Sequence, residues 1–190
     1  LDLYVVNNGT PNLLYRNEDD SFVEVSGKLG VNDDGDGSGA VWTDHDLDGD
    51  LDLYVVNYGQ ANRFYQNGLD ENIGELLFKE VGRELKLDDD GRGMGATWVD
   101  FDGDGDLELS LAQFDAPNRL FEQGENGKYS DIASQLNIAD KGLGQQAVWG
   151  DYNGDGNLDV YAVNGGDESN DLSRLYKQVE DQRFINVATE

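Results

Sequence analysis

The residues best suited to chemistry stand in an aspartate-rich nonapeptide that occurs three times in the chain. It reads DHDLDGDLD at residues 44–52, DFDGDGDLE at residues 100–108 and DYNGDGNLD at residues 151–159. Each copy carries oxygen-bearing side chains at positions 1, 3, 5 and 9, and a glycine at position 6 where the backbone must turn sharply. Oxygens that converge in this way are the ligands of a hard cation such as Ca²⁺. The spacing predicts three calcium-binding loops.

The closing ligand of each loop is the acidic residue at position 9. An EF-hand loop opens with the same spacing but closes on a glutamate at position 12. Position 12 holds Val55, Leu111 and Ala162, none of which can bind a cation. Position 9 is followed at once by an alternating apolar run such as LYVV, which is typical of a β-strand. We therefore expect each loop to enter a strand rather than a helix.

An empty loop of this kind is electrostatically unfavourable. Carboxylates crowded to about 5 Å repel by roughly 3 kcal/mol per pair at an effective dielectric constant near 20. A divalent cation reverses the sign of this interaction. A solvated acidic loop without metal is the alternative for any single copy, but three copies at one place in a repeat favour metal binding.

Composition excludes several classes of function. Asp and Glu number 40 against 13 Lys and Arg, giving a net charge of −27, which argues against binding to nucleic acid or anionic membranes. The chain has no cysteine and one histidine, His45, which we expect to point outward from position 2 of the first loop. Few residues remain for nucleophilic or acid–base catalysis. We expect no enzyme activity, no catalytic residue and no organic cofactor.

The length of 190 residues suits one domain, and no apolar run approaches the length of a membrane span. The chain opens directly on the strand-like segment LDLYVV, so we expect a processed chain or a fragment. Extracellular modules bind calcium at roughly 10⁻⁴–10⁻³ M. We therefore expect a secreted or cell-surface protein.

The elements that must position the loops repeat with them. Position 9 falls at residues 52, 108 and 159, with an equivalent aspartate at residue 2, so the period is near 50 residues. Each period contains four short segments of the types AVWTD, LYVVN, NRFYQN and FKEV. The predicted fold is all-β, a β-propeller of about four blades of four antiparallel strands with the first blade incomplete, or a segment of a larger propeller. A stacked solenoid is the structural alternative. The expected repeats of this single domain span approximately 1–36 (partial), 37–92, 93–143 and 144–190.

The stretch GAVWTDHDLDGDLDLYVVNYGQANRFYQN resembles the FG-GAP-like (VCBS) repeat family, relatives of the integrin alpha-subunit propeller. The resemblance implies that the loop between the first two strands of a blade binds calcium, through the side chains at positions 1, 3, 5 and 9 and the carbonyl of position 7. The implied ligands are Asp44, Asp46, Asp48, Asp50 and Asp52 in the first loop; Asp100, Asp102, Asp104, Asp106 and Glu108 in the second; and Asp151, Asn153, Asp155, Asn157 and Asp159 in the third.

Two substitutions depart from the family pattern. Glu108 is one methylene longer than the usual aspartate, and Asn153 is neutral, so the third loop offers three carboxylates where the others offer four. Because ligand charge tunes calcium affinity, we expect the third loop to be the weakest site. No metal is expected at Asp2, which stands without the earlier positions of a loop.

Other residues also recur at equivalent places. We expect Trp42, Trp98 and Trp149 to pack in the core rather than to form a sugar-binding ring, and Arg63, Arg119 and Arg174 to pair with carboxylates rather than to bind an anion. Longer connections start at Asn67 and at Gly165, and they are more readily explained as tolerated insertions than as specificity loops.

The function predicted from these observations is that of a calcium-binding, calcium-stabilised extracellular β-propeller acting as a structural, adhesive or ligand-binding module. The alternative is a polysaccharide-active enzyme or its carbohydrate-binding scaffold domain. The first repeat has only three predicted strands, and an unpaired edge recruits another strand. We therefore expect self-association into a ring or filament, or pairing with neighbouring repeats.

Overall fold

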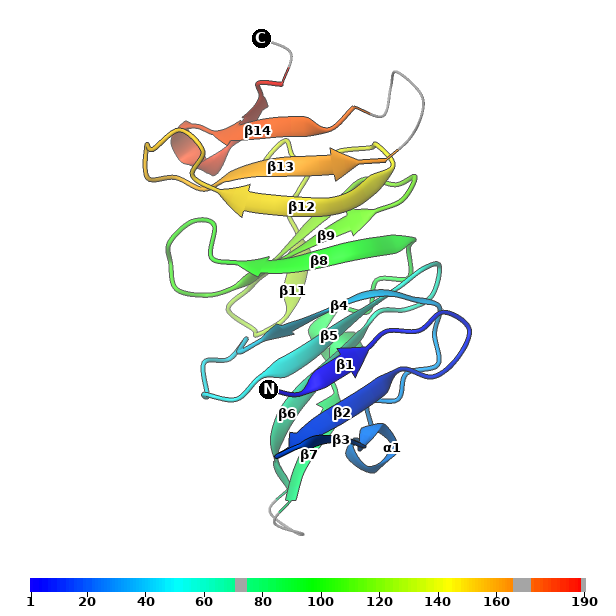
Figure 1. The fold of residues 1–190 in the computed structure, drawn as a ribbon. Helices are drawn as coiled ribbons and strands as arrows, with labels where there is room; N and C mark the ends of the chain where they lie inside the picture. The colour runs from blue at the N-terminus through cyan, green and yellow to red at the C-terminus, as the bar shows by residue number, and fades with distance from the viewer. Residues whose placement is uncertain (71–74, 166–171, 189–190) are drawn as a thin grey trace. The chain divides into compact units, whose positions relative to one another are not determined.

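The computed structural model describes residues 1–70, 75–165 and 172–188. These residues form fifteen β-strands in four antiparallel sheets, the first with three strands and the others with four (Figure 1). Within every sheet the strands are neighbours in chain order, as in a meander. The predicted all-β fold is confirmed, with four blade-like sheets of which the first is incomplete.

The strands follow the predicted segments closely. The first sheet contains β1 (Leu3–Val5), β2 (Leu13–Glu18) and β3 (Ser21–Glu24). The second contains β4 (Gly37–Thr43), β5 (Asp52–Asn57), β6 (Arg63–Asp70) and β7 (Glu75–Glu80). The third contains β8 (Gly93–Val99), β9 (Glu108–Gln113), β10 (Arg119–Gln123) and β11 (Tyr129–Asp131). The fourth contains β12 (Gly144–Gly150), β13 (Asp159–Asn164), β14 (Arg174–Gln178) and β15 (Phe184–Asn186).

Three short helical segments were not predicted. They are α1 (Ser26–Leu29), α2 (Gly82–Leu85) and the 3₁₀ turn η1 (Glu180–Gln182). Each is a single turn, which is too short to show a 3.6-residue apolar period in the sequence. No helix in the described part of the chain is long and apolar enough to cross a membrane.

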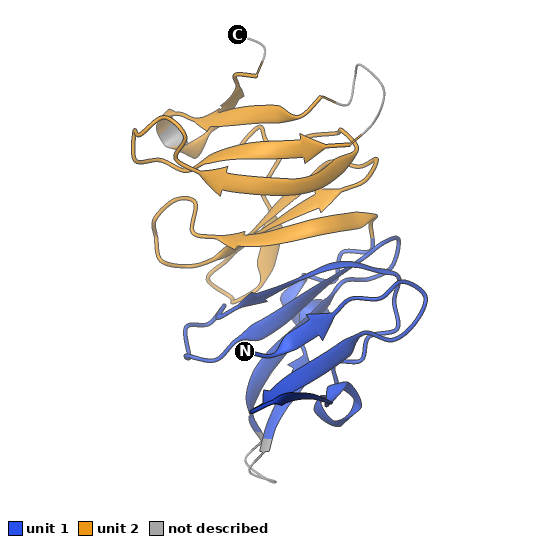
Figure 2. Cartoon of the chain, in the orientation of Figure 1, with its two compact units in different colours: residues 1–90 blue, residues 91–190 orange. Residues whose placement is uncertain are grey.

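The chain divides into two compact units, residues 1–90 and residues 91–190 (Figure 2). The first unit holds the first two sheets, and its core gathers buried side chains such as Leu14, Leu53 and Val55. The second unit holds the other two sheets around a core that includes Leu120 and Phe184. The expectation of a single domain stays a prediction.

Within these units, the second strand of a sheet is its most buried part. Both β5 and β9 are buried at all six positions. A strand that is covered on both faces needs a nearly continuous apolar run, as LYVV in β5 provides. The acidic loops lead directly into these strands, so the loop ends are held by the most buried strands of their sheets.

The recurring tryptophans pack against other rings, as predicted. In the first unit the ring centroid of Trp42 lies 6.3 Å from that of Tyr4 and 6.1 Å from that of Phe78. In the second unit Trp149 lies 6.0 Å from Phe101 and 5.8 Å from Phe184. The third tryptophan, Trp98, makes an edge-to-face contact with Tyr129 at 5.8 Å. Two of these contacts, Trp42 with Tyr4 and Trp149 with Phe101, connect a sheet to the neighbouring sheet or its loop, and the other contacts lie within one sheet.

The recurring arginines pair with carboxylates, as was expected from the sequence. Arg63 Nε lies 3.1 Å from Oδ1 of Asp33, in the connection that leads into β4. Arg174 makes the same pair with Asp140, in the connection that leads into β12. Arg119 lies 3.4 Å from Asp131 in β11. Each of the first two pairs ties the third strand of a sheet to the segment that enters that sheet.

The two longer connections lie partly outside the described residues. The segment from Asn67 was expected to be a loop, but β6 continues to Asp70 and pairs with β7 from Glu75, so its described ends are strand. Residues 71–74 and 166–171 are not described, and the prediction of tolerated insertions stays untested there.

Candidate metal centres

Each acidic loop connects the first and second strands of its sheet. The residues that flank the loops pair directly across the two strands: Thr43 with Asp52, Val99 with Glu108, and Gly150 with Asp159. The glycine at position 6 has a φ of +96°, +97° and +90° in the three loops. Residues other than glycine rarely adopt this left-handed backbone conformation, which explains why glycine recurs at position 6.

The acidic residue at position 9 is the most deeply buried ligand candidate of each loop. Asp52, Glu108 and Asp159 are 1%, 2% and 1% exposed. In all three loops one oxygen of this carboxylate accepts a hydrogen bond of 3.3 Å from the backbone N–H of the residue at position 2. Position 9 therefore closes each loop through hydrogen bonds of the protein itself.

The position-9 aspartates also hold the third strand of their sheets. The second oxygen of Asp52 accepts a hydrogen bond of 2.8 Å from the N–H of Asn67 in β6, and that of Asp159 accepts one of 2.8 Å from Gln178 in β14. Asp2, their counterpart in the first sheet, accepts one of 2.9 Å from Asn17 in β2. A cation bound at position 9 would thus be linked to three strands of a sheet.

In the first loop three carboxylates come together. One oxygen each of Asp44, Asp46 and Asp48 lies within 4.8 Å of the others. At position 7, Oδ1 of Asp50 is buried and has no hydrogen-bond partner among the described residues. Burial, and then the charges of the neighbouring aspartates, raises the pKa of Asp50. Carboxylates that crowd together in this way fit a divalent cation.

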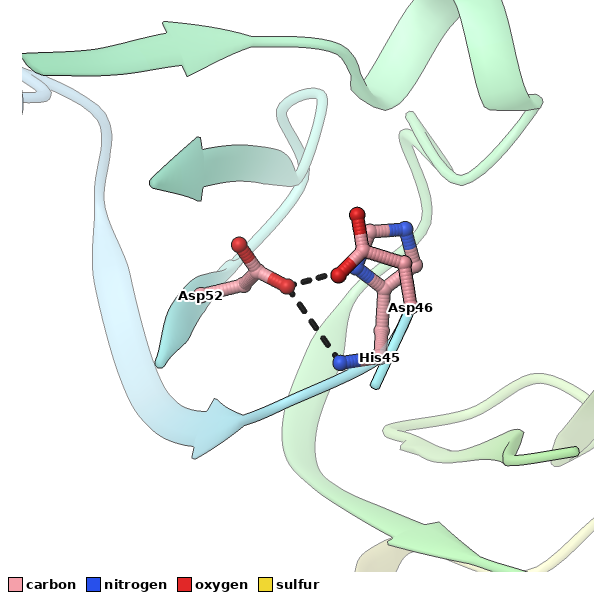
Figure 3. Close-up of side chains that lie close together, drawn as sticks. All are labelled: His45, Asp46 and Asp52. Carbon is pink, nitrogen blue, oxygen red and sulfur yellow. Dashed lines mark hydrogen bonds and ion pairs between the residues drawn. The ribbon is translucent and has the colours of Figure 1, made fainter. Parts of the chain in front are cut away.

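His45 does not point outward, and that expectation was wrong. Its side chain is 5% exposed, and Nδ1 lies 2.5 Å from Oδ2 of Asp52 (Figure 3). The imidazole ring also packs edge-on against Phe64. Thr43 and His45 are both buried because the two-residue alternation of β4 continues into the loop. His45, Asp46 and Asp52 offer ligand atoms within 4.8 Å of one another, so the histidine is a further candidate ligand of the first loop.

In the second loop a different set of carboxylates meets. One oxygen each of Asp100, Asp102 and Glu108 lies within 4.8 Å of the others. Burial raises the pKa of Glu108 to about 8, against the lowering effect of the N–H of Phe101, and the charges of Asp102, Asp104 and Asp100 add to the rise. The pKa of Asp102 is raised as well, first by burial. The buried carboxyl group of Glu108 is surrounded by negative charges, and this environment fits a cation-binding site.

Position 5 is tied to position 7 in every loop. The carboxylates of Asp48, Asp104 and Asp155 accept hydrogen bonds of 3.1, 2.9 and 3.0 Å from the backbone N–H two residues ahead. Asp104 and Asp106 are not part of the cluster in the second loop. The predicted ligands at positions 1, 3 and 9 are therefore the ones that this loop brings together.

The third loop does not bring its aspartates together in this way. In the described part of the chain, Asp151, Asp155 and Asp159 do not form a group with oxygens within 4.8 Å of one another. Asn153 at position 3 donates its amide N–H to Asp159 at 3.1 Å, and Asn157 donates to Asp155 at 2.9 Å. The third loop thus has amide donors at positions 3 and 7, where the other two loops have aspartates.

The FG-GAP-like repeat family matches residues 44–111 and 100–162, which together span more than half of the chain. The chain belongs to the FG-GAP-like repeat family. Each FG-GAP-like match begins at position 1 of an acidic loop and extends beyond position 9 of the next one, so the loops lie within the family pattern. No curated protein matches the chain.

Three side chains that contact the FG-GAP-like loops were missed in the sequence. Gln66 donates to Asp46 at 2.6 Å, Gln182 donates to Asp102 at 3.3 Å, and Lys177 lies 3.1 Å from Asp155. Gln66 and Lys177 occupy the same register position in the third strand of their sheets. That recurrence is visible when the strand sequences are aligned, and it could have shown which residues face the loops.

Proposed function

We propose that the chain is a calcium-binding, calcium-stabilised extracellular β-propeller module with a structural, adhesive or ligand-binding role. One observation carries the proposal: two of the three acidic loops each gather three carboxylate oxygens within 4.8 Å of one another. Calcium binds oxygen ligands in this arrangement, and its charge offsets their repulsion. A secreted or cell-surface location is proposed with it, because extracellular modules bind calcium at roughly 10⁻⁴–10⁻³ M.

The residues of the chain hold the ion and couple it to the sheet. In the first loop Asp44, Asp46 and Asp48 would bind calcium, with Asp52 at the buried end. Because Asp52 is hydrogen-bonded to Asn67 in β6, calcium at this carboxylate links the loop to the third strand. In the second loop Asp100, Asp102 and Glu108 would hold the ion in the same way.

A non-enzymatic role is part of the proposal. The second and third loops line a cleft of about 980 Å³ together with Lys177, Glu180 and Arg183. A polysaccharide-active enzyme would need a pair of carboxylates that are not committed to metal. Among the described residues that line this cleft, Glu180 is the one carboxylate outside the acidic loops. Asp155 of the third loop also lines this cleft, but its carboxylate is paired with Lys177, so we propose that the cleft is not a hydrolytic site.

Calcium binding is tested by counting bound ions in single-loop variants. Asp46→Asn in the first loop and Asp102→Asn in the second are each expected to remove one bound calcium ion at 1 mM free calcium, as measured by equilibrium dialysis with radiolabelled calcium. The matched control is Asp34→Asn, which makes the same charge change at an exposed position before β4. A wild-type protein that binds no calcium, or an Asp34→Asn variant that loses as much as the other two, would refute the proposal.

We also propose that the edge of the first sheet pairs with another copy of the chain or with a neighbouring repeat. In the described part β1 has one partner strand, β2, whereas β5, β9 and β13 each have two. A groove of about 630 Å³ is lined by side chains that include Leu14, Trp42 and Phe78. In the second unit Phe101 packs against Trp149 and Phe184, the counterparts of Trp42 and Phe78. By analogy, a strand that pairs with β1 could place an aromatic residue of its following loop in this groove, against Trp42 and Phe78.

Self-association is expected to appear as a mass above that of the monomer in light scattering with calcium present. Leu3→Lys places a charge on β1, where the side chain is 48% exposed, and is expected to restore the monomer because lysine blocks edge pairing. Phe22→Lys on β3, the opposite edge of the same sheet, is the matched control and is expected to leave association unchanged. A monodisperse wild-type monomer would contradict self-association.

A further inference from the structure

The third acidic loop satisfies its carboxylates with donors of the protein. Asp151 accepts hydrogen bonds from the backbone N–H groups of Gly154, Asp155 and Gly156 at 2.7, 3.2 and 2.9 Å. Asp159 accepts three more, from Tyr152, Asn153 and Gln178. In the second loop, by contrast, Glu108 is buried beside three aspartates with the N–H of Phe101 as a donor. The position-9 carboxylate of the third loop is therefore better supplied with donors, among the described residues, than Glu108 of the second loop.

The third loop also has a cation of its own. Nζ of Lys177 in β14 lies 3.1 Å from Oδ2 of Asp155, the residue at position 5. Its ammonium group interacts favourably with the charge of Asp159 at position 9 as well, and both residues help to raise the pKa of Lys177. Asp155 and Lys177 are each about one-third exposed, so this pair is partly sheltered from water. The ammonium is thus placed beside the loop's position-5 carboxylate and near its position-9 carboxylate.

The other two loops have no positive charge at this register position. Strand pairing aligns Lys177 with Gln66 in β6 and with Glu122 in β10. Gln66 donates a neutral N–H to Asp46 in the first loop, and Glu122 is acidic. The two loops that gather carboxylates thus have an uncharged or acidic residue at this place, and the loop that does not has a lysine.

We propose that the ammonium group of Lys177 takes the place of calcium in the third loop, so that this chain binds calcium at its first and second loops only. The inference rests on the proposed function for those two loops. A divalent ion near Asp155 and Asp159 would have to displace the ammonium or bind beside a like charge. Lysine is suited to this role because its flexible stem carries a compact charge with three donors.

The inference is tested by Lys177→Gln, which installs the residue that the first loop has at this position. Backbone amide resonances of the position-6 glycines, Gly49, Gly105 and Gly156, report on each loop separately in ¹⁵N–¹H spectra during titration with calcium chloride. In the wild type Gly156 is expected to stay unshifted at calcium concentrations that saturate the other two. In Lys177→Gln, Gly156 is expected to titrate with at least tenfold tighter affinity, in the range of roughly 10⁻⁴–10⁻³ M.

Two further variants locate the effect. Lys141→Gln removes an equal charge from an exposed residue at the opposite end of the fourth sheet, and it is expected to leave Gly156 unshifted. Adding Asp155→Asn to Lys177→Gln is expected to abolish the new titration. Near-identical spectra of the calcium-free variants would show that they remain folded.

The outcomes separate this inference from the proposed function. A Gly156 resonance that titrates equally in the wild type and in Lys177→Gln, or in neither, overturns the inference. Titration of Gly49 and Gly105 decides the proposed function independently. If those two glycines do not respond while Gly156 responds in Lys177→Gln alone, the proposed function fails and the role of Lys177 stands.

Discussion

Calcium at 10 mM is expected to raise the melting temperature of the protein by about 10 °C or more relative to EGTA. A site occupied at 100 times its dissociation constant adds roughly 2.7 kcal/mol to the free energy of unfolding. Each of the two compact units holds one of the loops that gather carboxylates, so both units are expected to gain. For a domain of about 100 residues, 1 kcal/mol corresponds to about 4 °C or more in melting temperature.

The control for this experiment must separate binding from screening. With a net charge of −27, any added salt weakens the repulsion within the chain and stabilises it. The comparison is therefore made at equal ionic strength with sodium chloride, and the double variant Asp46→Asn with Asp102→Asn is measured beside the wild type. This variant is expected to lose most of the calcium-dependent shift. A wild-type shift below a degree or two would contradict calcium stabilisation.

The strand β5 could be predicted from the sequence because three independent local signals agree. In β5, alternation and β-branching indicate a strand, the acidic loop fixes its start, and the turn before Asn62 fixes its end. The repeat then transfers this assignment to β9 and β13, whose sequences alternate less clearly. Repetition thus supplied information that a single copy lacks.

The positions of side chains around the loops could not be predicted in the same way. His45 was placed outside by analogy with a curling loop, whereas the strand alternation of β4 extends into it. The aromatic residues at the same position in the other copies behave differently: Phe101 is 3% exposed, whereas Tyr152 is 54% exposed. Local spacing identifies which residues offer oxygens, but the neighbouring strand decides what else those oxygens meet.

The differences among the three loops depend on contacts between residues that are distant in sequence. Gln66 contacts Asp46, which lies 20 residues earlier in the chain, and Lys177 in β14 contacts Asp155 in the loop before β13. The pairs Arg63–Asp33 and Arg174–Asp140 bridge still longer separations. The number of carboxylates in each nonapeptide predicts that the third loop binds calcium most weakly. The strand register adds a second influence on calcium affinity, because it decides which side chain of the third strand lies beside each loop.

Calcium binding to the second loop is expected to depend steeply on pH, because Glu108 must lose a proton to become a ligand. Its pKa is raised from 4.5 to about 8 in the folded protein without calcium, so between these values the folded chain holds a proton that the unfolded chain has lost. The free energy of unfolding without calcium therefore falls as pH rises from about 5 to 8. Calcium affinity runs in the opposite direction, since the ion competes with that proton.

The expected affinity of the second loop falls about tenfold for each pH unit well below 8, and about fiftyfold from pH 8 to pH 6, with no further gain well above pH 8. Titrations at pH 6, 7, 8 and 9, followed through the amide resonance of Gly105, measure this dependence. Glu108→Gln removes the titrating group, so its weaker calcium binding is expected to change little over the same range. An equally flat profile for the wild-type loop would contradict this prediction. It would show that Glu108 is ionised in the folded protein at neutral pH, and that burial and the nearby aspartates do not raise its pKa to about 8.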